Sequence, residues 1–189
     1  GEDGERWGLD FSTDATFNDY WTGYGDYSAV SDNDYLSDLN RGLSISQATH
    51  LQRRGGIRYR GDAQQLDAYL SGYQTISDFI ADADRPYSRL PEVQYSGLAD
   101  MGPVTLGLDS QYTFFYRDND DLNGLDQANG HRFRALPELA LPLSSPWGYL
   151  RPSIGVDYTR YALDDFGLGE RRFDRTVPVA EWDSGLYFD

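Results

Sequence analysis

Carboxylate side chains recur at one parity along this chain, and they are the residues best suited to chemistry. Glycoside hydrolysis needs two carboxylates roughly 5–9 Å apart. Here the acids are spread over five segments rather than gathered in one. They are Asp10, Asp14, Asp67, Asp109, Glu138 and Asp157. A phosphate-binding glycine loop and a nucleophile elbow are both missing from the sequence. The spacing therefore predicts a long polar wall, and we expect no enzyme activity.

Metal chemistry finds little support in the sequence. It contains two His and no Cys, and neither His50 nor His131 has a partner at zinc-motif spacing. We expect both histidines to be polar wall or loop residues. The acidic segment 118–126, DNDDLNGLD, resembles a calcium loop, but Leu122 stands where that motif needs Asp or Asn. We expect no metal and no cofactor.

Three arginines, Arg54, Arg58 and Arg60, share one parity in the segment QRRGGIRYR. Guanidinium groups suit phosphates and carboxylates. One interpretation is a route for an anionic lipid. The other, which we favour, is that they pair with acids of neighbouring strands.

The elements that position these side chains are predicted by alternation with a period of two. In 104–117, for example, Leu106, Leu108 and Phe114 oppose Asp109 and Gln111. We predict about nine strands, at 7–17, 20–30, 43–60, 64–77, 89–99, 104–117, 131–143, 148–162 and 172–188. A bulge in 43–60 and another in 172–188 would explain their less regular alternation.

The predicted connections alternate between short and long. Short turns fall at 18–19, 61–63, 100–103 and 144–147, and longer acidic loops at 31–42, 78–88, 118–130 and 163–171. Most strands reach the roughly 9–11 residues that cross a bilayer at a tilt. Aromatic residues also cluster near strand ends, as in the girdles of membrane barrels. These features favour an all-β, antiparallel up-and-down transmembrane β-barrel over a soluble β-sandwich.

The composition agrees with this fold class. The chain has 189 residues, 15% of them aromatic, and a net charge of −15. The acidic balance argues against nucleic acid as a partner. No run of about 18 apolar residues is present, yet transmembrane β-strands hide their apolar residues in alternation.

Two features of the predicted sheet are unusual. Bacterial single-chain barrels have an even strand number, so about nine strands indicate a segment of a larger barrel. Pro137 and Pro152 lie inside predicted strands, where each lacks a ladder donor. We predict bulges or locally unpaired backbone at both, whereas Pro142 and Pro146 fall at strand ends or turns.

Four stretches resemble the outer-membrane LPS-assembly protein family, LptD. They are DYSAVSDNDYLSDL (26–39), RPYSRLPEVQYSG (85–97), HRFRALPELALPLSSPWGYLRPSIGVDYTRY (131–161) and RTVPVAEWDSGLYFD (175–189). The segments LPLSSPWGYLRP and RTVPVAEWDSGLYF carry most of the resemblance. Their order and spacing extend it over nearly the whole chain.

The resemblance implies that residues 1–189 are part of an outer-membrane β-barrel domain in a Gram-negative cell, with an N-terminal periplasmic domain and the remaining strands absent. The family carries lipopolysaccharide to the outer leaflet. Its implied partners are an LptE-type plug lipoprotein inside the barrel, the periplasmic Lpt bridge proteins, the barrel-assembly machinery and outer-membrane lipid.

From the alternation we predict which side chains line the lumen and contact lipopolysaccharide or the plug. They are Asp67, Tyr69, Asp109, Gln111, Asp157 and Thr159. Two alternatives remain open at the level of sequence: a different outer-membrane porin or transporter barrel, and a soluble sugar-binding β-sandwich or hydrolase.

Overall fold

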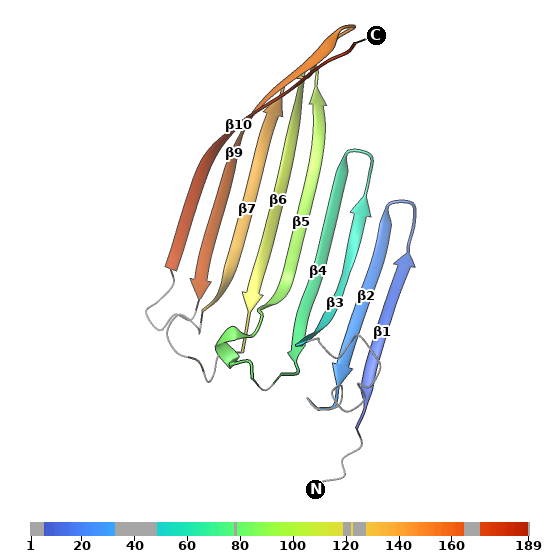
Figure 1. Ribbon diagram of the computed structural model, residues 1–189, viewed down its shortest axis with the longest axis vertical. Helices are drawn as coiled ribbons and strands as arrows, with labels where there is room; N and C mark the ends of the chain where they lie inside the picture. Colours follow the sequence, from blue (N-terminus) through green and yellow to red (C-terminus); the bar gives the residue numbers. More distant parts are fainter. Residues whose placement is uncertain are drawn as a thin grey trace.

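The chain forms one antiparallel sheet in a computed structural model that describes residues 6–32, 49–77, 79–118, 122, 128–164 and 171–188. The ten strands follow the order β1-β2-β3-β4-β5-β6-β7-β9-β10, with β8 beside β9 (Figure 1). Their bounds are β1 Gly8–Thr16, β2 Trp21–Val30, β3 His50–Arg60, β4 Gln64–Thr75, β5 Ser88–Met101, β6 Val104–Tyr116, β7 Asn129–Ala140, β8 Leu143–Ser145, β9 Gly148–Asp164 and β10 Arg171–Leu186. One short 3-10 helix, η2, covers Asp82–Asp84. The predicted all-β, up-and-down architecture is confirmed.

The tenth strand arises because the predicted strand 131–143 is divided. β7 ends at Ala140 and β8 begins at Leu143. Both pair with β9 in the same register, from Ala140 opposite Ser153 to Leu143 opposite Leu150. The break falls at Pro142, which has no N–H to give to a ladder. Of the predicted strand 43–60, residues 43–48 lie outside the described part of the chain.

Connections alternate in length as predicted. Short turns join β1 to β2, β3 to β4, β5 to β6 and β8 to β9, and the strand ends between which the longer stretches of sequence run lie at the other end of the sheet (Figure 1). The Asn18 side chain accepts hydrogen bonds from the backbone N–H groups of Tyr20 and Trp21, both at 2.9 Å. Gly102 closes the β5–β6 turn with a φ of 71°, a conformation that suits glycine.

Cross-strand pairing sorts the side chains onto two faces. One row of partners runs Arg58, Asp67, Gln94, Gln111, Arg134, Thr159 and Arg175 across seven strands. The face that carries this row is called the polar face. The neighbouring row begins Ile57, Ala68, Val93, Tyr112 and Phe133, and its face is called the apolar face. The faces alternate because successive side chains of a strand point to opposite sides.

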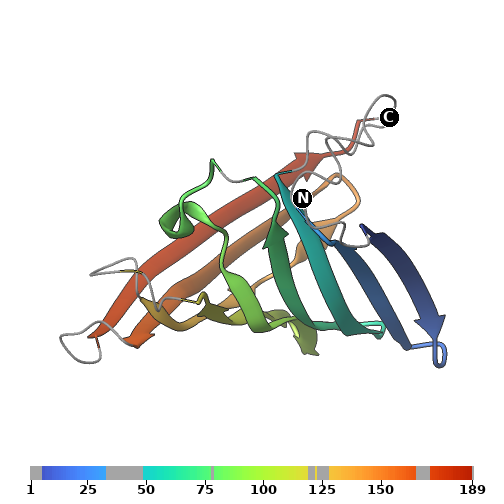
Figure 2. The ribbon, with the colours of Figure 1, turned by 90° about the horizontal axis from the view of Figure 1, so that it is seen from below.

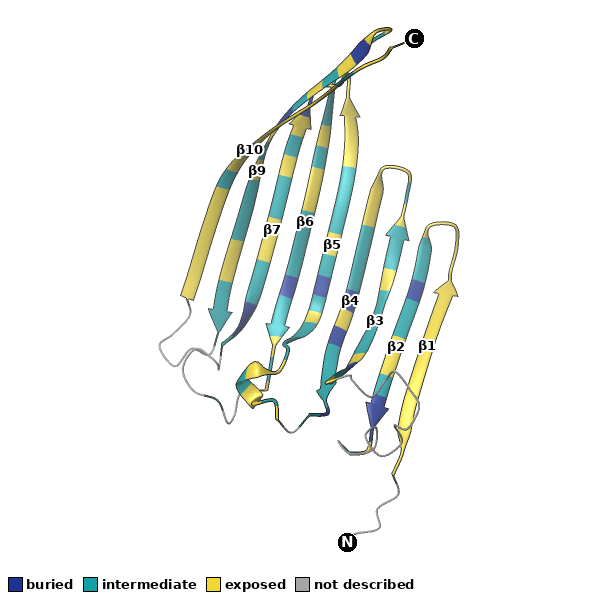
Figure 3. Ribbon diagram, in the orientation of Figure 1, coloured by how far each residue is buried: buried dark blue, intermediate teal, exposed yellow. Residues whose placement is uncertain are grey.

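Buried residues are scattered along the sheet (Figure 3), and most of the buried polar side chains lie on the polar face. Tyr69, Ser71, Glu92, Thr113 and Ser153 are buried, and all belong to the polar face. Many large side chains of the apolar face are exposed, including Phe11, Leu70, Ile154 and Trp182, whereas Ala29 and Leu51 of this face are buried. The only buried hydrophobic cluster among the described residues is small: Val30, Leu51 and Ile76. A soluble sandwich would cover its apolar face with a second sheet, and the described residues form a single sheet.

The sheet is curved but not closed. Figure 2 shows that the strands do not lie in one plane, and β1 and β10 each have a neighbour on one side only. An open, curved, up-and-down sheet is consistent with part of a larger barrel. No helix within the described ranges is long and apolar enough to cross a membrane.

The irregularities in pairing lie partly where the sequence predicted them. Pairing of β7 with β9 skips the positions around Pro137, between Ala135 and Glu138, without a change of register. Locally unpaired backbone at Pro137 is therefore confirmed on the β9 side, whereas toward β6 Pro137 pairs regularly with Leu108. Pro152 makes no bulge, because it pairs regularly with Trp182. On its other side the ladder is interrupted at the β7–β8 break, where the Leu141 N–H donates to the Pro152 carbonyl at 3.0 Å, so the predicted local loss of pairing is confirmed there.

The predicted bulges in 43–60 and 172–188 are wrong for the described residues. β10 keeps one register with β9 from Arg171 to Leu186, and β3 keeps one register with β4 from His50 to Arg60. The register between β5 and β6 shifts instead between Arg89 and Glu92, the segment that contains Pro91. A proline removes one ladder donor, which favours an irregularity there.

Candidate functional site

The polar face is hollowed where β3 to β7 lie side by side. The hollow has a volume of about 480 Å³. Charges of both signs and several amides line it: Arg58, Arg60, Gln65, Asp67, Gln94, Asp109, Gln111 and Arg134. Such a lining offers hydrogen-bond donors and acceptors to a large polar ligand.

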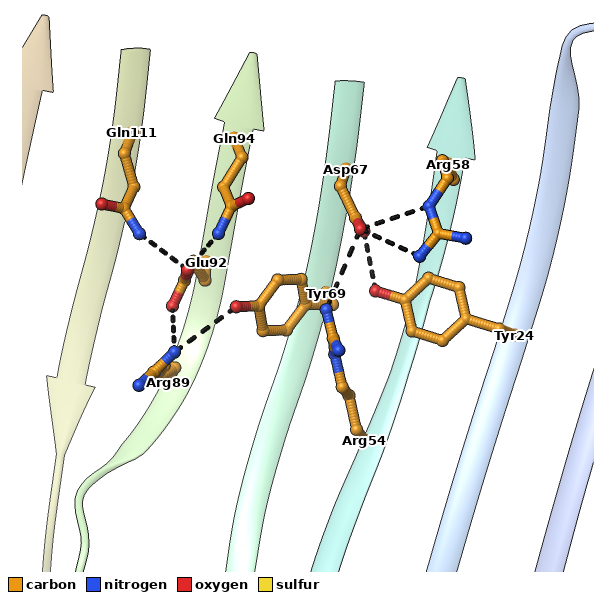
Figure 4. Close-up of polar contacts among 9 residues, drawn as sticks. All are labelled: Tyr24, Arg54, Arg58, Asp67, Tyr69, Arg89, Glu92, Gln94 and Gln111. Atoms are coloured by element: carbon orange, nitrogen blue, oxygen red, sulfur yellow. Dashed lines mark hydrogen bonds and ion pairs between the residues drawn. The ribbon is translucent and has the colours of Figure 1, made fainter. Parts of the chain in front are cut away.

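Asp67 anchors a cluster on β2, β3 and β4 (Figure 4). Tyr24 donates its hydroxyl to Oδ1 at 2.7 Å, and Nη2 of Arg58 lies 3.2 Å from Oδ2. Nη2 of Arg54 is 3.8 Å from the same oxygen. The strand register explains the cluster, because Arg58 and Asp67 are direct cross-strand partners. The favoured pairing with neighbouring acids is thus confirmed for Arg54 and Arg58.

Gly56 leaves the room that this cluster needs. A Cβ there would lie 2.6 Å from both the Ala68 carbonyl oxygen and the Tyr69 Cβ, and 3.0 Å from the Tyr24 hydroxyl. The Arg54 guanidinium carbon lies 3.8 Å from the centroid of the Tyr69 ring, within the range of a cation–π contact. The stacked Arg54 links Asp67 to the next cluster.

A second cluster surrounds Glu92 on β5, as Figure 4 shows. Only 1% of Glu92 is exposed. Its Oε1 accepts hydrogen bonds from the amides of Gln94 and Gln111, at 2.6 and 2.7 Å. Nη1 of Arg89 donates to Oε2 at 3.0 Å and lies 3.5 Å from the Tyr69 hydroxyl. A buried charge is tolerated when it is paired and fully hydrogen-bonded, and Glu92 meets both conditions.

A third group lies on β7 and β9. Arg134 binds both oxygens of Asp157, with Nε 3.0 Å from Oδ1 and Nη2 2.7 Å from Oδ2. Thr159 Oγ1 lies 3.5 Å from Oδ1 of the same carboxylate. This bidentate geometry fixes the planes of the two groups.

All six predicted site residues lie on the polar face, but they do not form one constellation. Asp67 and Tyr69 belong to adjoining clusters, and Gln111 joins Glu92 while accepting a hydrogen bond from Arg132 at 2.8 Å. Asp109 is exposed and lines the hollow. The Asp157 and Thr159 group is the separate third one.

Sequence reasoning missed three residues that hold these clusters together: Arg89, Glu92 and Arg134. Nothing in single-strand alternation distinguishes a buried Glu92 from an exposed Asp109. The available signal was the pattern Glu92-x-Gln94 at the polar parity, opposite a strand with Gln111 at the same parity. Three amide and carboxylate groups on adjacent strands predict a hydrogen-bonded cluster.

The histidines differ from the prediction in one respect. His50 is on the polar face, where its ring nitrogen lies 3.0 Å from Thr75 Oγ1. His131 lies on the apolar face rather than lining a polar wall, stacked on Phe114 with ring centroids 4.6 Å apart. No group of three or more His, Asp or Glu side chains suited to a metal occurs among the described residues. The segment 118–126 lies largely outside them.

Comparison with known sequences places these features in a family. The family model LptD, described as LPS transport system D, matches residues 4–189. The chain is 65% identical over 189 residues to the LPS-assembly protein LptD of Marinobacter nauticus, covering 100% of this chain and 24% of that protein. It is 42% identical over 191 residues to the protein of the same name from Hahella chejuensis, with 100% and 24% covered.

A third relative, the LPS-assembly protein LptD of Alcanivorax borkumensis, is 39% identical over 171 residues, which cover 89% of this chain and 22% of that protein. The chain thus spans about a quarter of the length of the curated relatives it matches. A family match over almost every residue agrees with the resemblance found in the sequence motifs. The chain belongs to the LptD family.

Proposed function

We propose that this chain is a stretch of transmembrane barrel wall in the outer membrane of a Gram-negative cell, acting in lipopolysaccharide assembly. In this proposal residues 1–189 form one part of a barrel domain. The apolar face contacts lipid, and the polar face lines the lumen through which lipopolysaccharide passes. The observation that carries the proposal is a single curved sheet with exposed apolar side chains on one face and a charged hollow on the other.

The chemistry of the polar face fits this substrate class. Lipopolysaccharide carries sugar hydroxyls and phosphates, and the hollow presents amides, arginines and carboxylates in one row. Asp67, Tyr69, Asp109, Gln111, Asp157 and Thr159 are the proposed lumen contacts. Asp109, and Arg60 beside these residues, are more available to a ligand because both side chains are exposed at the hollow. Asp67 and Asp157, in contrast, are held by arginines.

Photocrosslinking in the complete protein tests which face meets lipopolysaccharide. The photoreactive residue p-benzoylphenylalanine would replace Asp109 on the polar face or its neighbour Leu108 on the apolar face. We expect lipopolysaccharide to be captured from position 109 only while the periplasmic Lpt bridge supplies it. Capture from 108 should not depend on that supply. Failure to capture it at 109 in cells that export lipopolysaccharide normally would contradict the proposed lumen.

The same photoreactive residue can test where a partner protein contacts the barrel wall. We propose that an LptE-type plug lipoprotein lies against the polar face and that the barrel-assembly machinery inserts the complete protein. A photoreactive residue in place of Arg60 should capture the plug lipoprotein, and one in place of Ile57 on the apolar face should not. Equal capture at both positions would contradict a plug on the polar side.

A substitution pair then asks whether the carboxylates matter. Asp109→Ala and Asp157→Ala in the complete protein should weaken plug binding or lipopolysaccharide export. If both were unchanged at normal protein levels, the proposed role of these two residues would be lost.

A further inference from the structure

The apolar face is not uniform: a groove of about 560 Å³ crosses it over β2, β3 and β4. Three backbone stretches form its floor at Gly25, Gly55 and Gly72. Its borders are Phe11, Tyr27, Arg53, Leu70 and Leu90. Phe11 and Leu70 are 55% and 54% exposed, so the apolar borders are uncovered in this structure.

Neither the space inside the sheet nor the backbone conformation requires glycine at these three floor positions. A Cβ at Gly55 would come no closer than 3.8 Å to another atom, and at Gly25 no closer than 3.5 Å. At Gly72 the nearest atom would be the Ser88 Oγ, at 3.4 Å. All three lack a left-handed φ. Glycine weakens a strand interior and often marks a place where a ligand approaches the backbone. The missing side chains are therefore explained by something outside the sheet.

One cation lies at the end of the groove nearer the long connections. The Arg53 guanidinium lies 4.9 Å from the Tyr27 ring centroid and donates to Gln74 Oε1 at 2.7 Å and to the Ser28 carbonyl at 3.3 Å. None of the described carboxylates pairs with it. These contacts hold the guanidinium in place, and no carboxylate of the described residues compensates its charge.

An acyl chain fits this groove better than a protein segment does. Gly25 and Gly55 belong to interior strands that are paired on both sides, so their backbones have no free ladder positions for an added strand. An acyl chain needs no hydrogen bonds and gains by contact with apolar walls. An anionic headgroup would compensate Arg53.

We propose that this groove binds one acyl chain of an anionic, phosphate-bearing membrane lipid, with the phosphate at Arg53. The inference rests on the proposed function only in placing the apolar face in a bilayer. The lipid would lie outside the barrel, with its headgroup toward the long connections. This site is therefore distinct from the one proposed in the lumen.

Photocrosslinking from the groove wall tests this site. The complete protein, with p-benzoylphenylalanine in place of Leu70, would be reconstituted in phosphatidylcholine vesicles containing a trace of labelled phosphatidylglycerol or labelled phosphatidylcholine. We expect phosphatidylglycerol to be captured about fivefold more efficiently, the effect of roughly one partly solvated hydrogen bond to a charged group. The same residue in place of Ile154, exposed on the apolar face outside the groove, should show no preference.

Two variants separate the parts of the site. Arg53→Gln should remove the preference and leave capture of phosphatidylcholine unchanged. Gly55→Leu fills the floor and should lower capture of both lipids at position 70 to the level at 154. Ala180→Leu, which places the same side chain on the apolar face of β10, is the matched control and should not change capture at position 70.

The outcomes distinguish this proposal from the one it rests on. Equal capture of the two lipids at position 70, or a preference that survives both variants, would overturn the lipid site. If lipopolysaccharide is still captured at position 109, the barrel proposal stands even when the lipid site is refuted. Absence of lipid capture at both 70 and 154 would mean that the apolar face does not meet a bilayer at all.

Discussion

Glu92 shows how a single-layer sheet can bury a charge. With 1% exposure it is among the least accessible side chains described, yet it lies beside the register shift near Pro91. Arg89, Gln94 and Gln111 hold its two oxygens from β5 and β6. We infer that this cluster secures the β5–β6 pairing where backbone hydrogen bonds are interrupted.

Removing that carboxylate should destabilise the barrel wall. Glu92→Ala leaves Arg89 and two amides without their acceptor, which costs about 2 kcal/mol. The measurement is the temperature at which the complete protein in detergent loses its compact, heat-modifiable migration on a gel. Glu181→Ala removes the same side chain from an exposed site on β10 and is the control. Equal transition temperatures for the two variants would refute the stabilising role.

Two adjacent glycines, Gly55 and Gly56, should differ in how much stability is lost when alanine replaces them. A Cβ at Gly56 would contact the Ala68 carbonyl oxygen at 2.6 Å, whereas one at Gly55 has only a contact at 3.8 Å. Gly56→Ala should therefore cost roughly 1–3 kcal/mol through overpacking. Gly55→Ala should be neutral or slightly stabilising, since alanine restricts the unfolded chain more than glycine does. The same thermal gel assay compares them, and an equal effect would contradict the packing around Tyr24.

At the scale of elements, the turns carry the most specific local requirement. Gly102 has a φ of 71°, which costs a residue with a Cβ roughly 1–2 kcal/mol. Gly102→Ala should lower the thermal transition, and Gly102→Asn should recover much of the loss because Asn tolerates this region better. An equally low transition temperature in both variants would contradict this explanation. It would show that the volume of the added side chain, rather than the dihedral angle φ, destabilises the turn.

Strand positions and face parity could be predicted from sequence because both follow from a local period of two. The strands 104–117 and 148–162 were predicted within two residues of β6 and β9 at each end. The split at Pro142 and the absence of a bulge at Pro152 could not be predicted, because each depends on the neighbouring strand. Pro152 forms no bulge since its unpaired side faces the β7–β8 break.

The sequence could predict on which face of the sheet the candidate site lies, but not which of its residues contact one another. Alternation placed Asp67, Gln111 and Thr159 at one parity, and the register puts all three in a single row. Their partners depend on register, which is set by turn lengths and by the shift at Pro91. A sequence without register cannot distinguish Glu92, buried in a cluster, from Asp109, exposed at the hollow.

The whole molecule is defined by two open edges and two unlike faces. Within the described part of the chain, β1 and β10 each pair with a strand on one side only, and the apolar face exposes large hydrophobic side chains. An open edge cannot be satisfied in lipid, so further strands must complete the wall if the sheet spans a bilayer. That requirement agrees with relatives about four times as long as this chain, of which it covers 24%.

The arrangement of connections gives the sheet an orientation that can be tested in cells. Short turns such as 61–63 lie at one end, and the longer connection that holds η2 lies at the other (Figure 1). Outer-membrane barrels have short periplasmic turns and longer extracellular loops. Asp84 and Asp62 are exposed residues at these two ends, and the chain contains no Cys of its own.

We therefore expect Asp84→Cys in the complete protein to react with a membrane-impermeant maleimide on intact cells, above the background of the parental protein. Asp62→Cys should react only after the outer membrane is permeabilised. The variants make the same exchange of an exposed aspartate, so a difference in labelling reports their location. Labelling of Asp62→Cys on intact cells together with protection of Asp84→Cys would reverse the orientation. Equal labelling of both on intact cells would contradict a membrane-spanning sheet.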